Sequence, residues 1–153
     1  MEQTELKFWE VKAKDKKEVI FSNGALLWET ANEYFNYCAE HPIRPGKTEG
    51  GEQFKPRVMV FTLQGVCLYM GCSPQYFRNH KNDLRSRADK LTDAEREVLD
   101  AMSRIEEVIY LYKYNYAVTG LLNARIIIRD LDLDGKKPVQ RPVFRIRQGN
   151  STM

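Results

Sequence analysis

Long apolar runs are absent from this chain. No stretch approaches the roughly 20 consecutive apolar residues that a helix needs to span a bilayer, and the first residues, MEQTELKFWEVK, lack the apolar centre of a secretory signal. These two absences exclude a membrane-spanning protein and a secreted one. The sequence therefore predicts a protein that acts inside a cell without engaging a membrane.

Cysteine and histidine are scarce. The three cysteines are an odd number without the spacing of a disulfide framework, so we expect free thiols in a reducing compartment. The chain has only two histidines, His41 and His80. No grouping supplies a nucleophile with its base, a carboxylate pair or a metal site. We therefore expect neither an enzyme nor a bound cofactor.

Three short patterns resemble ligand sites, but each lacks a required part. Zinc-type ligands occur without a Cys-x-x-Cys pair, so small core residues are the better interpretation. An alternating run of aspartates lacks the closing glutamate of a calcium loop. Residues 46–48 read Gly-Lys-Thr, but His41 stands where a phosphate-binding loop requires glycine. The first two sets are Cys38, His41, Cys67 and Cys72, and Asp130, Asp132 and Asp134.

Acidic residues are missing from the end of the chain. The 153 residues, 42% hydrophobic and 29% charged, suit one globular domain with an appendage, and the net charge is only +3. Basic residues nevertheless outnumber acids in residues 78–90 and stand alone after Asp134, whereas acids dominate residues 92–115. Two cationic zones flanking an acidic helix suit a protein that holds a polyanion and a protein partner, although solvated faces are the alternative.

The first half of the chain predicts an arm, a helix and a hairpin. Residues 1–21 are polar and lysine-rich, so we expect a flexible arm that docks through Trp9. Ser22 or Asn23 then caps a helix over residues 24–40, whose apolar stripe is typical of a core. Residues 54–62 look extended and could pair with residues 43–44 as a small β-hairpin. The stripe is Leu27, Ala31, Tyr34 and Cys38.

Residues 62–85 predict a helix-turn-helix. Gly71 follows a short helix, Ser73 is a capping hydroxyl, and Pro74 occupies the first position of a second helix. Phe77 and Leu84 can pack inward on that helix, which leaves polar and basic side chains outside. Those side-chain types pair with base edges and phosphates in a major groove, although two helices that only pack together remain the alternative.

Residues 92–133 predict a long helical hairpin for oligomerisation. Thr92 and Glu95 form a capping box, and Asn123 caps the last helix. Apolar residues recur near heptad spacing, so we expect part of this surface to meet another subunit, whereas covering the domain's own core is the alternative. Residues 135–153 form a basic tail in which residues 143–147 suggest a short strand. The interface residues are Val98, Met102, Ile105, Ile109, Tyr112 and Tyr116.

Together these segments resemble a known family. The order LWETANEYFNYCAEHPI, TLQGVCLYMGCSPQYFRNH and RIEEVIYLYKYNYAVTGLLNARIIIRDLDL is similar to the small terminase subunits of tailed bacteriophages, the P22-like DNA-packaging proteins. The similarity covers residues 27–133 and leaves out the arm and the tail. The predicted fold is mainly α, with a helix-turn-helix, a small β-hairpin, the helical hairpin and a short C-terminal strand.

The resemblance implies a DNA-packaging subunit that is not an enzyme. Such a protein recognises viral DNA, assembles as a homo-oligomeric ring and delivers DNA to the large terminase subunit, in the cytoplasm of a host cell or encoded by a prophage. In such families a basic C-terminal segment carries the DNA affinity in some members, so either cationic zone is a candidate. The DNA-binding candidates are Gln75, Tyr76, Arg78, Asn79, Lys81, Arg85 and Arg87 in the helix, and Lys136, Lys137, Arg141, Arg145 and Arg147 in the tail.

Two other functions fit the same residues. A helix-turn-helix transcriptional regulator is usually a dimer on paired half-sites, so the mass of the assembly separates it from a ring. A pure assembly protein would keep the helix pair only for packing, and it would not bind DNA at low salt.

Overall fold

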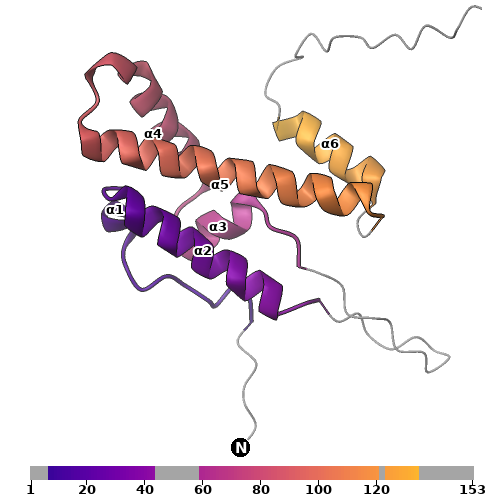
Figure 1. The fold of residues 1–153 in the computed structure, drawn as a ribbon. Coiled ribbons are helices and arrows are strands. Elements are labelled where there is room, and N and C mark those ends of the chain that lie inside the picture. Colours follow the sequence, from indigo (N-terminus) through magenta and orange to yellow (C-terminus); the bar gives the residue numbers. More distant parts are fainter. Residues whose placement is uncertain (1–6, 44–58, 121–122, 135–153) are drawn as a thin grey trace, which may run out of the picture. The chain divides into compact units, whose positions relative to one another are not determined.

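The described part of the chain is helical. The computed structural model describes residues 7–43, 59–120 and 123–134, and Figure 1 shows their arrangement along the chain. Contacts divide the protein into two compact units, residues 1–113 and residues 114–153. The elements are α1 (Lys17–Ile20), α2 (Gly24–Glu40), α3 (Leu63–Met70), α4 (Pro74–Ser86), the 3-10 turn η1 (Ala88–Lys90), α5 (Asp93–Val118) and α6 (Ala124–Asp134).

Side-chain caps define where these helices start, as the sequence predicts. Asn23 Oδ1 accepts from Leu26 N at 3.2 Å in α2, and Ser73 Oγ accepts from Tyr76 N at 3.0 Å in α4. At α5, Thr92 Oγ1 accepts from Glu95 N at 3.2 Å while Thr92 N donates to the Glu95 carboxylate. Each cap satisfies a backbone N–H that has no partner inside its helix. The mainly α class is therefore confirmed, and α3 and α4 lie within residues 62–86.

The turn between α3 and α4 has the geometry that its glycine predicts. Gly71 has φ 75°, a conformation that side chains with a Cβ rarely adopt. Gly71 N donates to Leu68 O at 3.2 Å, and Cys72 N donates to Cys67 O at 2.9 Å. This pair of bonds is the Schellman motif, which closes the end of a helix and turns the chain. The motif fixes where α4 begins.

The core of the first unit lies between α2, α3, α4 and α5. Phe77 from α4 and Val66 from α3 are completely buried, together with Met102 and Ile105 from α5. The stripe of α2 that was predicted as core is also buried. Burial of these side chains is the main force that holds the helix-turn-helix onto its long neighbour.

The N-terminal segment belongs to the folded unit from an earlier point than the sequence predicts. Ile20 and Phe21 are buried in the core, and Phe21 packs edge-on against Phe77 with 6.0 Å between ring centroids. A flexible arm through residue 21 is therefore wrong for this pair, because two adjacent bulky apolar side chains gain more from burial than the chain loses in freedom. Trp9 is 52% exposed and stacks edge-on with Phe8 rather than entering the core.

The extended run before α3 is a packed connection and forms no strand in residues 59–62. Phe61 inserts between Phe35 and Tyr112, with ring centroids 4.7 and 3.8 Å away. Thr62 is already the cap of α3. The predicted β-hairpin finds no support here, and Ile43 makes only an isolated bridge. Residues 44–58 and the predicted strand at 143–147 lie outside the described residues.

Much of the surface predicted for oligomerisation lies inside the chain's own core. Four of its residues are buried, with 6% exposure or less, and Tyr112 stacks on Phe61. This is the alternative that the heptad pattern left open. An apolar stripe at heptad spacing does not show whether it packs against helices of the same chain or against another subunit. Only half-buried Tyr116 lies outside this core. The four buried residues are Val98, Met102, Ile105 and Ile109.

Candidate nucleic-acid interface

Helix α4 presents a polar face opposite its buried one. Phe77 and Leu84 point into the core, whereas Gln75, Asn79 and Arg85 are exposed. Gln75 Nε2 donates to Asn79 Oδ1 at 2.7 Å, one helical turn along the same face. The bond holds two amide groups side by side, where their remaining donors and acceptors match those of adenine edges.

Lys81 lies on the buried side of α4. Its side chain is only 7% exposed, and its ammonium makes an ion pair with the Glu106 carboxylate of α5. A phosphate would have to displace that partner and reach a buried group, so this ion pair argues against the predicted Lys81 phosphate contact. The position falls four residues after Phe77, and the helical period therefore places both on one face.

The basic residues near the end of α4 have different surroundings. Arg87 donates to Asp83 at 2.9 Å and pairs with Glu95 at 2.7 Å. The Arg87 guanidinium, as a hydrogen-bond donor, holds the pKa of Glu95 below its ordinary value. Arg87 therefore already pairs with two carboxylates and links α4 to the start of α5. By contrast, the Arg85 side chain is exposed and the Arg78 side chain is half-buried. The predicted tail residues 136–147 lie outside the described range.

Tyr76 is held at the start of α4 by an aromatic cluster. Its ring centroid is 5.1 Å from that of Phe21 and 6.2 Å from that of His80, and the Lys17 ammonium lies 4.9 Å over the ring. Burial and then the Glu18 carboxylate raise the pKa of the Tyr76 hydroxyl. Tyr76 is therefore half-buried and supports α1 against α4, besides being a predicted base contact.

The sequence did not predict that a lysine-rich segment lies beside the helix-turn-helix. Ala13 N donates to Tyr69 O at 2.8 Å, which places the lysine-rich residues 12–17 next to the end of α3. Five lysines and five acids cancel in residues 1–23, so a charge count gave no signal. The Ile20–Phe21 pair was the available signal, because buried residues there fix the preceding segment against the fold.

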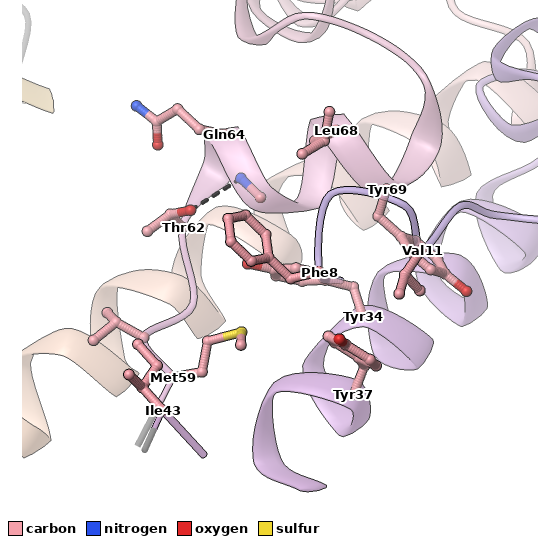
Figure 2. Close-up of a pocket in the computed structure, with 12 residues that line it drawn as sticks. Phe8, Val11, Tyr34, Tyr37, Ile43, Met59, Thr62, Gln64, Leu68 and Tyr69 are labelled. Atoms are coloured by element: carbon pink, nitrogen blue, oxygen red, sulfur yellow. Dashed lines mark hydrogen bonds between the residues drawn. The ribbon is translucent and has the colours of Figure 1, made fainter. Parts of the chain in front are cut away.

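An apolar pocket lies beside α2 and α3 in the first unit (Figure 2). Its volume is about 480 Å³, and it is lined by Phe8, Val11 and Ile43 together with residues of α2, of α3 and of the segment just before α3. Among its polar groups, the Thr62 hydroxyl accepts from Gly65 N at 2.9 Å and the Tyr69 hydroxyl donates to Glu33 at 2.7 Å. A Cβ on Gly65 would fall 1.9 Å from the Tyr34 hydroxyl. Glycine therefore allows α2 and α3 to meet beside the pocket.

The residues weighed as zinc ligands fall into separate surroundings. Cys67 and Cys72 contact each other across the Schellman turn, Cys38 contacts Tyr34, and the exposed ring of His41 stacks on Tyr37. No cluster of three or more metal-ligand side chains occurs among the described residues. The side chains of Asp132 and Asp134 and the sequence at 46–48 lie outside what is described. In the same part of the chain, no helix is long and apolar enough to cross a membrane.

The thiols should differ in reactivity. The hydrogen bond from Cys67 and the nearby charge of Lys17 lower the pKa of Cys72. The same hydrogen bond, together with burial, raises the pKa of Cys67. Burial also raises the pKa of Cys38. We expect iodoacetamide near neutral pH to alkylate Cys72 first, because the thiolate is the nucleophile. Peptide mass spectrometry checks the site, and Cys72→Ser should abolish this adduct. Equal labelling of all three thiols in the folded protein would contradict the prediction.

Comparisons with known proteins place the sequence in a family. A family described as DNA-packaging protein gp3 matches residues 16–139, which include the helix-turn-helix and α5. The chain is also similar to a protein named terminase, small subunit, of Salmonella phage P22. Their identity is 27% over 139 residues, which cover 88% of this chain and 78% of that relative. Since the family match spans most of the chain, the protein belongs to the DNA-packaging protein gp3 family.

Proposed function

We propose that this protein recognises viral DNA, assembles as a ring and delivers the DNA to a large terminase subunit. The observation that carries DNA recognition is the helix-turn-helix, in which burial of Phe77 and Leu84 leaves the polar face of α4 exposed. Membership of a DNA-packaging family supports the same role. A non-enzymatic role agrees with this proposal, since large-subunit motors supply the chemistry in the family that the sequence resembles.

The exposed face of α4 suggests how contacts divide. We assign phosphate contacts to Arg78 and Arg85, which make no ion pair with a carboxylate within the described part of the chain. We assign base contacts to the hydrogen-bonded pair Gln75 and Asn79. Phosphate contacts position a protein on the duplex, and base contacts select the sequence. Arg87 and the basic tail remain additional candidates.

Replacing Arg78 and Arg85 together tests the helix. Each phosphate contact releases counterions, so Arg78→Gln/Arg85→Gln should make the slope of log affinity against log salt shallower by about 1.8, or about 0.9 per contact. Fluorescence anisotropy with a labelled mixed-sequence duplex between about 50 mM and about 200 mM salt measures this slope. Arg145→Gln/Arg147→Gln in the tail removes the same charge. A slope that changes only in the tail variant would move the DNA site there.

Ring assembly needs an apolar surface that the monomer leaves exposed. Leu111 is 48% exposed and Val118 is 68% exposed, and both side chains belong to α5. Exposed apolar residues gathered on one segment commonly mark a subunit interface. We therefore place the contact between copies on these residues rather than on the buried heptad positions.

Light scattering coupled to size exclusion tests this interface. The wild-type chain should elute as an assembly far above the 17.9 kDa monomer, and Leu111→Glu/Val118→Glu should lower that mass because a charged side chain cannot enter an apolar contact without a partner. Leu68→Glu, at another exposed apolar position, is the matched control and should leave the mass unchanged. A clean wild-type dimer would favour a transcriptional regulator instead.

A further inference from the structure

A small cleft separates the N-terminal segment from the helix-turn-helix. This turn cleft, of about 280 Å³, has Lys12, Lys16 and Lys17 on one wall and Met70 and Gly71 on the other. The wall that carries the lysines is fixed at both ends. At one end Ala13 N bonds to Tyr69 O at 2.8 Å, and beyond the other end the core residues Ile20 and Phe21 are buried. The lysines therefore keep their place beside the turn.

The three lysines differ in what they contact. Lys17 is half-buried and its ammonium lies over the Tyr76 ring, so it has a local partner. Lys12 and Lys16 are exposed, and neither makes an ion pair within the described part of the chain. Two cations with a fixed backbone and no carboxylate partner are available to an external anion. Asp15 and Glu18 also border the cleft, so the net charge of its rim is only slightly positive.

The position of the turn cleft decides which anion it meets. The wall at Gly71 is followed directly by Cys72, Ser73 and the first turn of α4. In a helix-turn-helix, the first residues of the second helix enter the major groove, so the phosphates at the edge of the groove pass beside the turn. The cleft thus continues the α4 surface towards the DNA backbone.

We propose that Lys12 and Lys16 are a second contact site for the phosphate backbone of duplex DNA, flanking the start of α4. The site rests on the proposed function, since it assumes that α4 faces DNA. It also extends that function, because the phosphate contacts then lie on both sides of the start of the recognition helix and fix its register as well as adding affinity. The alternative role for these lysines is to compensate the negative C-terminal end of α3.

The test compares two full-length variants that lose equal charge. Lys12→Gln/Lys16→Gln removes the cleft lysines, and Lys7→Gln/Lys14→Gln removes two lysines of the same segment that do not line the cleft. The probe is a labelled mixed-sequence duplex, and the readout is the slope of log affinity against log salt. We expect the cleft variant to flatten the slope by about 1.8, from about 0.9 per contact, and the control variant to change it by less than one contact. Lys12→Arg/Lys16→Arg should retain the wild-type slope.

The remaining outcomes separate this site from the proposed function. A flattened slope in Arg78→Gln/Arg85→Gln with no change in the cleft variant would overturn the cleft site alone. No DNA binding by the wild-type protein at low salt would overturn both. If the slope of log affinity against log salt flattens equally in the cleft and control variants, the effect is one of general charge, and the cleft site is overturned. A lower urea midpoint with an unchanged slope would assign the lysines to α3 stability, against the proposal.

Discussion

Phe77→Ala should reduce the free energy of unfolding by about 3–5 kcal/mol. The side chain has no exposed surface, and it lies in the core that joins α4 to α1, α2 and α5. Truncation removes its transfer free energy and leaves a cavity whose walls, including Phe21 at 6.0 Å between ring centroids, cannot fully close. Since whole domains are stable by only about 5–15 kcal/mol, this single change removes much of the margin.

Urea unfolding followed by circular dichroism measures this loss, with Phe77→Leu as the matched control. Leucine keeps most of the apolar volume, so the control should lose about 1.5 kcal/mol or less if the core repacks. Arg85→Ala, at an exposed position of α4, should change stability by about 0.5 kcal/mol or less. A Phe77→Ala variant as stable as these two would mean that α4 is not anchored through its buried face.

Local chemistry explains why so much of the fold was predictable. Asn23, Ser73 and the Thr92–Glu95 box each satisfy helix ends with atoms three residues away, so the sequence carries the whole signal. Gly71 likewise needs only its own conformation and its neighbours' carbonyls. The helix boundaries in the described chain therefore follow from short-range rules.

The errors arise where partners are far apart in the sequence. A heptad pattern cannot say which surface covers Met102 and Ile105, and the answer is the chain's own helices. Likewise, the Lys81 ammonium finds its carboxylate 25 residues later, at Glu106. Residues 12–17 lie beside the turn partly because Ala13 N bonds to Tyr69 O, a contact between residues separated by about half the first unit. Such pairings are set by tertiary packing, for which a local pattern holds no information.

The candidate site shows the same division. The polar face of α4 followed from helical spacing, and Gln75 and Asn79 lie on it as predicted. Which cations remain available did not follow, because Arg87 is shared between Asp83 and Glu95 in the fold. A count of basic residues therefore overstates the phosphate contacts of α4, and the number of free cations has to come from the tertiary structure.

Removing the Glu106 carboxylate should be far more damaging than removing the Lys81 charge. In Glu106→Ala, the buried ammonium of Lys81 loses its partner, and an uncompensated buried charge typically costs about 3–5 kcal/mol. The Glu106 side chain is 34% exposed, so water screens the pair, and we expect a loss of about 2 kcal/mol. Lys81→Met, which replaces the charged group by an apolar chain of similar length, should be nearly neutral because desolvating the ion pair already cost free energy.

Urea unfolding of a double-mutant cycle measures this asymmetry. Lys81→Met/Glu106→Ala should be more stable than Glu106→Ala alone, since the second substitution removes the charge that the first one leaves buried. Lys81→Met should also leave the dependence of DNA affinity on salt unchanged, unlike Arg78→Gln/Arg85→Gln. If Lys81→Met instead flattens that dependence, the ammonium must leave Glu106 to reach a phosphate, and the α4–α5 contact would open on DNA. A neutral Glu106→Ala variant would mean that water reaches Lys81 in solution.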